Sequence, residues 1–260
     1  MLKRMSHCAA AAAVLACGLS AHASVIYSAD FESPTYTLNS AIAGQAGWTA
    51  SSGNDLVRGS SYGGGWASNG QYLVVNGDND IAKSPAFTSN GQTTTTISYD
   101  VRPGDSATSV GQSAGTQYIM DNAVTTRMMF SMYFRSDGSG GSKGTIWAAN
   151  GATYTDTNIP WQFVDHNTLY HIDVTLDSTA KTWSLSVNNG SAVTGSFSAV
   201  FGFSASTSGE PGSAWLRGGK NNNPGGLVAY DNLTVTAVPE PAAGLLIMGG
   251  LLPMLRRRRR

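Results

Sequence analysis

The chain has 260 residues, and its 16 Lys and Arg balance 16 Asp and Glu. The first 23 residues hold two of the basic residues, and the last 23 hold five basic residues and one acidic residue, so residues 24–237 keep nine basic and 15 acidic residues, a formal charge of about −6. This charge argues against nucleic acid or an anionic lipid surface as a partner, because both are bound through clustered Lys and Arg.

The N-terminus has the three parts of a secretory signal peptide. Lys3 and Arg4 precede an apolar run over residues 8–19, and small residues lead to a cleavage site between Ala23 and Ser24. The apolar run is too short to span a bilayer core, which needs about 20 helical residues. We therefore expect signal peptidase to remove residues 1–23 after export; an ordinary alanine-rich helix is the alternative.

Both cysteines, Cys8 and Cys17, lie in this leader, so the mature chain is expected to hold no disulfide and no cysteine-ligated metal. Residues 14–17 also faintly resemble a lipoprotein box. Leu15 stands where a small residue is usual, so cleavage after Ala23 is favoured over lipidation.

Residues 24–237 are predicted to form one all-β domain, because apolar residues recur there with period two and helical periods are hard to find. Strands that follow one another without helices pair in antiparallel fashion. The predicted strands are 25–31, 71–75, 93–101, 128–135, 144–148, 170–176, 182–187, 213–217 and 227–236. A closed barrel is possible, but this length favours an antiparallel two-sheet sandwich of jelly-roll type.

The clearest local unit is a hairpin over residues 169–187, whose two alternating strands flank a polar turn. Trp183, Leu185 and Val187 are expected to share the buried face of the second strand. The following Asn188-Asn189-Gly190 tolerates positive φ, which predicts another tight turn toward Phe197.

Three short segments resemble concanavalin A-like and laminin-G-like jelly rolls: 27–32, 230–235 and Gly44-Gln45-Ala46-Gly47-Trp48. The first two resemble the terminal strands of those folds. The resemblance implies that the first and last strands of this domain are neighbours.

No catalytic residue is assigned from the sequence. Glycoside hydrolysis needs two carboxylates, and jelly-roll glucanases carry them in a Glu-x-Asp-x-Glu pattern, but Glu32 and Glu210 are the only glutamates of the predicted domain and neither lies in such a motif. Asp173 and Asp177 share the solvent side of a predicted strand. The histidines His166 and His171 are interpreted as surface residues, and there is no Gly-x-Ser-x-Gly elbow. A secreted carbohydrate-active hydrolase with an unrecognised site remains the alternative.

No metal ligand set or cofactor is predicted, although a structural calcium ion is possible. Asp78-Asn79-Asp80 offers oxygen ligands, but calcium takes 6 to 8 of them and a turn explains this segment better. Asp30 and Asp231 would approach each other if the terminal strands pair, and bonding of each side chain to local backbone is the simpler interpretation.

Glycan binding is the remaining specific possibility, through exposed aromatic rings. Tyr62 and Trp66 flank three glycines and Trp161 follows Pro160, so all three are expected in loops that could expose a ring. The alternative is that these rings close the edge of the sandwich. The predicted core tryptophans are Trp48, Trp183 and Trp215.

The C-terminus, residues 238–260, has three parts in a fixed order. The extended motif Val238, Pro239, Glu240 and Pro241 comes first, then an apolar stretch over residues 242–255, then five basic residues: Arg256, Arg257, Arg258, Arg259 and Arg260. As a helix the apolar stretch reaches about 21 Å, which is short of the roughly 30 Å hydrocarbon core. The arginines act as a cytoplasmic stop to transfer.

These three parts resemble the PEP-CTERM sorting signal of Gram-negative-type bacteria. The resemblance implies transient insertion in the inner membrane, cleavage near residues 238–241 by an exosortase, and delivery to the cell surface or the exopolysaccharide matrix. A permanent anchor is the alternative, because hydrophobic mismatch costs only fractions of a kcal/mol per Å.

Overall fold

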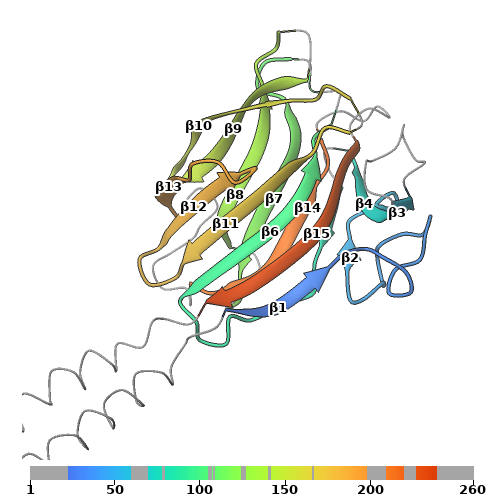
Figure 1. Cartoon of the computed structure of the whole chain (residues 1–260), viewed down its shortest axis with the longest axis horizontal. Coiled ribbons are helices and arrows are strands. Elements are labelled where there is room, and N and C mark those ends of the chain that lie inside the picture. The colour runs from blue at the N-terminus through green and yellow to red at the C-terminus, as the bar shows by residue number, and fades with distance from the viewer. Residues whose placement is uncertain are drawn as a thin grey trace, which may run out of the picture.

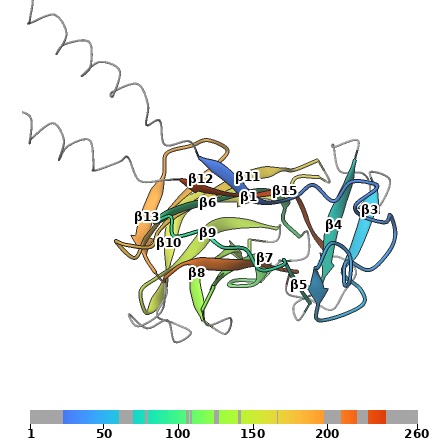
Figure 2. The ribbon, with the colours of Figure 1, turned by 90° about the horizontal axis from the view of Figure 1, so that it is seen from below.

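Strands make up all the regular structure of the residues that can be described. The computed structural model describes residues 23–59, 70–77, 80–104, 107, 109–123, 127–139, 142–165, 167–197, 209–219 and 227–238. Over these residues there are fifteen strands, and they form two antiparallel sheets that lie one over the other (Figures 1 and 2). No helix suited to crossing a membrane occurs in this part of the chain. The predicted leader and C-terminal helices fall outside the described residues.

The first sheet has eight strands, seven of them in one path. In spatial order these are β13 (Val193–Ser196), β12 (Thr182–Val187), β11 (Tyr170–Asp177), β6 (Thr94–Arg102), β15 (Leu227–Val238), β4 (Gln71–Asn76) and β3 (Leu56–Gly59). The eighth strand, β1 (Ser24–Ala29), also pairs with β15. The expectation that the first and last strands are neighbours is confirmed, with Ser24 opposite Ala237.

The second sheet has seven strands and covers the inner face of the first. In spatial order they are β10 (Thr153–Gln162), β9 (Lys143–Asn150), β8 (Met128–Ser136), β7 (Ser113–Asp121), β14 (Pro211–Arg217), β5 (Ile81–Lys83) and β2 (Thr49–Ala50). The two-sheet sandwich is therefore confirmed, and the barrel alternative is wrong, because each sheet keeps its own pair of edge strands.

The core lies between the sheets, where every second residue of each strand points inward. Ile172, Val174 and Leu176 of β11 are fully buried, and Trp183 and Leu185 of β12 pack beside them as predicted. Burial of each such side chain contributes about 1.5 to 3 kcal/mol. The largest fully buried side chains are Trp48, Tyr72, Tyr99, Tyr230, Phe31 and Phe130.

The predicted turns are also present. Asn188 and Asn189 both adopt positive φ, and the Gly190 N–H donates to the Val187 carbonyl at 2.9 Å, so this tight turn joins β12 to β13. Six of the fifteen strands were not predicted: the short strands β2, β3, β5 and β13, and two longer strands of the second sheet, β7 and β10.

Candidate functional site

The outer face of the seven-stranded sheet carries a row of aromatic rings. Because Ile119, Phe130 and Ile146 point into the core, the residues between them point outward. We call the resulting set the aromatic face; each ring is half-buried, and its members are Tyr118 of β7, Tyr133 of β8, Trp147 of β9, Tyr154 of β10 and Trp215 of β14.

These rings are contiguous across the sheet. Tyr133 lies with its ring centroid 5.2 Å from that of Tyr154, at 80°, and 6.5 Å from that of Trp147. The Tyr154 hydroxyl donates to Ser131 Oγ at 2.8 Å, reaching across β9 to β8. Ser131 is opposite Tyr118, which is opposite Trp215. The aromatic face therefore crosses five adjacent strands.

Basic side chains accompany the rings. Lys83 Nζ lies 4.0 Å from the centroid of the Trp215 ring, and Arg135 Cζ lies 4.1 Å from that of Trp147. Such cation–π contacts contribute about 0.5 to 1 kcal/mol at exposed sites. Between these two ends, the Arg217 guanidinium donates to the Tyr118 hydroxyl at 3.0 Å.

The face is hollowed at its β8–β10 end. A depression of about 640 Å³ is lined by Arg135, Trp147, Asp156, Pro160 and, among others, Lys143. Asp156 accepts hydrogen bonds from Thr145 Oγ1 at 2.9 Å and from the Asn158 N–H at 2.8 Å. The indole N–H of Trp147 donates to the same Thr145 hydroxyl at 3.1 Å, which fixes the ring at the rim of the depression.

Two tyrosine hydroxyls of this face, those of Tyr133 and Tyr154, have a raised pKa and are neutral at physiological pH. Partial burial raises the pKa of Tyr133, and it raises the pKa of Tyr154 to about 12 against the opposing effect of the Ser131 hydrogen bond. A ligand on this face therefore meets apolar rings with hydroxyl groups at their edges, and not phenolate anions.

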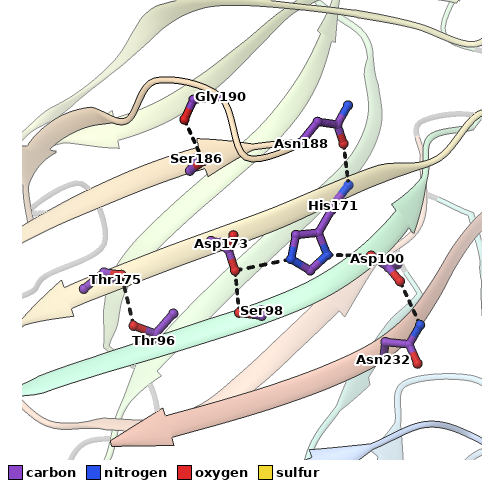
Figure 3. A network of polar contacts seen from close by, with 10 residues as sticks. All are labelled: Thr96, Ser98, Asp100, His171, Asp173, Thr175, Ser186, Asn188, Gly190 and Asn232. Atoms are coloured by element: carbon purple, nitrogen blue, oxygen red, sulfur yellow. Dashed lines mark hydrogen bonds and ion pairs between the residues drawn. The ribbon is translucent and has the colours of Figure 1, made fainter. Parts of the chain in front are cut away.

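The opposite outer face of the sandwich has a different chemistry. On β6, β11 and β12 the outward residues are Ser, Thr, Asp and His, apart from the buried Arg102 at the end of β6, and none of them is aromatic. Figure 3 shows His171 of β11 between two carboxylates: Nδ1 lies 2.7 Å from Asp100 Oδ1, and Nε2 lies 3.4 Å from Asp173 Oδ1. The interpretation of His171 and Asp173 as outward-facing surface residues is confirmed.

The partners of His171 account for the network. The hydrogen bond to Asp100 raises the pKa of His171 and links β6 to β11. Ser98 donates its hydroxyl to Asp173, at 2.5 Å, and not to His171, so these residues do not form the serine–histidine–carboxylate relay of a hydrolase (Figure 3). The geometry is that of a cross-strand polar ladder.

Two of the tryptophan predictions are wrong. Trp161 lies in β10 and not in a loop, and it donates its indole N–H to the Arg135 carbonyl at 3.0 Å. Its ring is 2% exposed and packs in the core, which agrees with the alternative of a buried ring and not with an exposed one. Trp215 was expected in the core but stands outward beneath Lys83. Trp48 and Trp183 are buried as expected. Tyr62 and Trp66 fall outside the described residues.

The acidic residues considered for calcium bond to local backbone. Asp30 Oδ1 accepts from the Glu32 N–H at 3.1 Å, and Asp231 Oδ1 accepts from the Asn232 N–H at 2.8 Å. Burial raises the pKa of Asp231 to about 7. In the described part of the chain no three His, Cys, Asp or Glu side chains are grouped to hold a metal. Asp78 and Asn79 are not among the described residues.

The remaining residues that the sequence singles out lie at the ends of the described ranges or outside them. Ser24 begins β1 and Val238 ends β15. His166, Pro239, Glu240, Pro241 and the C-terminal arginines are outside the described residues.

The aromatic face was missed because its members were judged one strand at a time. Tyr133 was correctly placed on the outward side of its strand, where its alternation with Met132 and Phe134 is visible in the sequence. An aromatic residue at an outward position of a predicted strand is the signal that could have found it.

Comparisons with known proteins give the fold. No family model and no curated protein matches the chain. Among solved structures, the carbohydrate esterase vb_24B_21 from Shiga toxin-encoding bacteriophage phi24B is 12% identical, with a TM-score of 0.57 over 84% of this chain and 100% of that one. The chain shares the β-sandwich fold of that protein.

Two further structures have the same architecture. A sialidase is 13% identical, with a TM-score of 0.51 over 85% of this chain but only 19% of its own length. The globular domain of calreticulin from T. cruzi is 11% identical, with a TM-score of 0.50 over 86% of this chain and 92% of that one. At these identities the similarity establishes the sandwich and not an activity.

Proposed function

We propose that this protein is an exported, non-catalytic carbohydrate-binding protein that holds glycan on the aromatic face. The observation that carries the proposal is the segregation of rings: five half-buried aromatic side chains follow one another across one outer face, while β6, β11 and β12 present none on the other. Sugar rings have apolar C–H faces that pack on aromatic rings, and hydroxyl groups that bond to polar side chains. The aromatic face offers both.

The depression beside Trp147 supports the proposal by its size and lining. A volume of about 640 Å³ lies within the range of about 300 to 1,000 Å³ seen in ligand sites. Its lining combines the Trp147 ring with the hydrogen-bonding groups of Thr145, Asp156 and Gln162. Two proteins of the same fold are named for action on carbohydrates, a carbohydrate esterase and a sialidase, which is in keeping with this ligand class.

The alternative is a secreted carbohydrate-active hydrolase. A glycosidase needs one carboxyl group that donates a proton and a second that acts as base or nucleophile. Asp137 and Asp156 both line the depression; Asp156 accepts hydrogen bonds from Thr145 and Asn158, and Asp137 accepts from the hydroxyl and N–H of Ser139. On the opposite face Asp100 and Asp173 contact His171. The Ser139 hydrogen bonds lower the pKa of Asp137, which does not suit that carboxyl group to donate a proton and favours binding over hydrolysis.

The processing segments define the proposed route to the surface. Signal peptidase would release residues 1–23 on export, and the C-terminal segment would insert transiently in the inner membrane until an exosortase cuts near residues 238–241. The proposed destination is the cell surface or extracellular matrix of a Gram-negative-type bacterium, where extracellular polysaccharide is the partner.

A binding titration with substitutions on the aromatic face tests the proposed function. The full-length chain, exported and purified, is titrated with the exopolysaccharide of its host. Trp147→Ala and Trp215→Ala are each expected to weaken binding about tenfold, since a lost ring contact of about 1.4 kcal/mol has that effect. Ser98→Ala, on the opposite face, serves as the matched control and is expected to bind as the unaltered chain does. Equal binding by all four proteins, or hydrolysis of the polysaccharide, would contradict the proposal.

A further inference from the structure

We infer that the ligand of the aromatic face is an acidic polysaccharide whose uronate carboxylates bind the basic side chains placed among the rings. This inference rests on the proposed function and adds the chemical class of the glycan. It is carried by the distribution of charge over the two faces of the sandwich.

Basic residues are concentrated on the outer face of the seven-stranded sheet. Lys83, Arg135, Lys143 and Arg217 occupy outward positions on β5, β8, β9 and β14, and Asp156 is the single carboxylate at an outward position on the strands of that sheet. The face thus has a formal charge of about +3, although residues 24–237 carry about −6. The domain as a whole is negative, but this one face is positive. A positive face of this kind attracts anions.

The other outer face carries the opposite sign. On β6 and β11 the outward residues include Asp100, Asp173 and Asp177, and the basic residues among them are His171 and the buried Arg102 at the end of β6. An acidic polymer is repelled from this side and attracted to the aromatic face, so the two faces of the sandwich discriminate by charge as well as by aromatic content.

Three of the cations on the aromatic face form no ion pair among the described residues: Lys83, Arg135 and Lys143. Lys143 is near enough to Asp137 for its charge to contribute to the lowered pKa of that carboxyl group. The hydrogen bonds of the two acidic residues at the depression come from other groups: Thr145 and Asn158 donate to Asp156, and the hydroxyl and N–H of Ser139 donate to Asp137. Lys83 and Arg135 therefore make no ion pair with any carboxylate that the structure describes.

The contacts between cations and rings suit a uronate residue. The Arg135 guanidinium lies over the face of the Trp147 ring and Lys83 Nζ over the face of the Trp215 ring, so a sugar bound beside either ring meets a positive charge there. A guanidinium binds a carboxylate through two parallel hydrogen bonds, whereas an ammonium acts as a point charge. One such unit at each end of the aromatic face fits a polymer with repeated carboxylates better than a single charged sugar.

The inference is tested with a matched pair of polymers: polygalacturonate and the neutral galactan obtained by reducing its carboxyl groups. The full-length chain is expected to bind the uronate polymer at least about tenfold more tightly, and the difference is expected to shrink as salt rises from about 50 to about 500 mM. Arg135→Gln and Lys83→Gln should each weaken uronate binding roughly three- to tenfold and weaken galactan binding by less than that. Arg135→Lys should retain part of the affinity. Lys181→Gln, in the β11–β12 turn, is the control for loss of one charge.

The outcomes separate this inference from the proposed function. One outcome would contradict the acidic ligand but not the glycan-binding face. In that case the chain would bind both polymers with equal affinity at every salt concentration, and Trp147→Ala would lose binding to both. If the chain binds neither polymer while it keeps its native near-ultraviolet circular dichroism spectrum, the acidic ligand is contradicted. The titration with the host exopolysaccharide then tests the proposed function separately. Tighter binding to single-stranded DNA than to polygalacturonate would also overturn it, because the face would then be a general polyanion site.

Discussion

Asp55 is a carboxylate enclosed by the fold at the start of β3. It is 0% exposed, its Oδ1 accepts the Asn76 N–H at 3.4 Å, and its Oδ2 has no hydrogen-bond partner among the described residues. Burial, and then the nearby Asp80 carboxylate, raise the pKa of Asp55 to about 7. Folding at neutral pH therefore places a costly negative charge in this position.

We expect Asp55→Asn to stabilise the protein in a pH-dependent way. A carboxyl group with a raised pKa stabilises the fold fully below its unfolded value of about 3.9, and that contribution is lost as the pH rises through 7. Asn keeps an acceptor for the Asn76 N–H and cannot ionise. Near pH 8 the variant should gain at least about 1 kcal/mol in free energy of unfolding, or roughly 2 to 4 °C in Tm.

Thermal unfolding near pH 4 and near pH 8 measures this effect. The stabilisation should be present near pH 8 and absent near pH 4. Asp165→Asn, on an exposed loop, controls for the loss of one negative charge. A change in Tm of equal size at both pH values would contradict the assignment of the raised pKa to Asp55.

For single residues, the sequence predicts which side chains are buried better than it predicts which other residues they contact. Trp48 and Trp183 were identified as core residues because large apolar side chains in alternating or turn-flanked segments are usually buried. Trp215 was misplaced because its neighbour Lys83 is 132 positions away along the chain, and a contact between β14 and β5 leaves no local pattern. The aromatic face depends on such distant pairs.

Among the elements, β12 connects the two sheets through one side chain. The indole N–H of Trp183 donates to the Ala149 carbonyl of β9 and to the Ser196 carbonyl of β13, both at 2.8 Å. Its ring meets Phe130 edge-on, with centroids 5.3 Å apart. Gly195 lies over the same ring, because a Cβ at that position would come within 2.3 Å of it. Trp183 thus joins both layers and one sheet edge.

We expect Trp183→Phe to lower the free energy of unfolding by about 1 to 3 kcal/mol, because it keeps an aromatic ring but removes the indole donor from the buried Ala149 carbonyl and from the Ser196 carbonyl. Denaturant unfolding at equilibrium measures the loss. The matched substitution Trp147→Phe, on the half-buried aromatic face, should change stability by only about 0.5 kcal/mol. If the two variants unfold at the same denaturant concentration, the Trp183 bridge does not hold the sheets together.

The elements found from the sequence are those with strict alternation. The strands β8, β11 and β12 have one buried and one outward face, and this arrangement imposes period two on the sequence. In β7 the fully buried Gln117 and Gly115 with its positive φ interrupt the apolar pattern. In β10 the positive φ of Asn158 accompanies a register shift between Asp156 and Pro160. Both strands form because adjacent strands supply their hydrogen-bond partners: β8 and β14 for β7, and β9 for β10.

For the whole molecule, the pairing of β1 with β15 brings the ends of the domain together. Ser24 is opposite Ala237, so the predicted signal-peptide cleavage site and the predicted sorting motif adjoin the same end of one strand pair. This pairing was expected from the resemblance to concanavalin A-like folds, and it could not have been derived from alternation alone.

We predict that protein recovered from the cell surface begins at Ser24 and lacks residues 256–260. Mass spectrometry of its terminal peptides measures both ends. In a strain without exosortase, the arginine-ended peptide should persist in the membrane fraction. Finding intact arginine-ended peptides in surface material of the unaltered host would show that the C-terminal segment is a permanent anchor.

The shared position of the two ends also determines how the molecule can be attached to a support. Both β1 and β15 belong to the eight-stranded sheet, which forms one layer of the sandwich (Figure 2). Tyr133, Trp147 and Trp215 point outward from the other sheet. A linker joined to either end, whether to a sensor chip or a fluorescent reporter, therefore leaves from the layer that does not carry the rings. Immobilisation by the N-terminus and by the C-terminus should give the same orientation, with the rings directed toward the flowing solution.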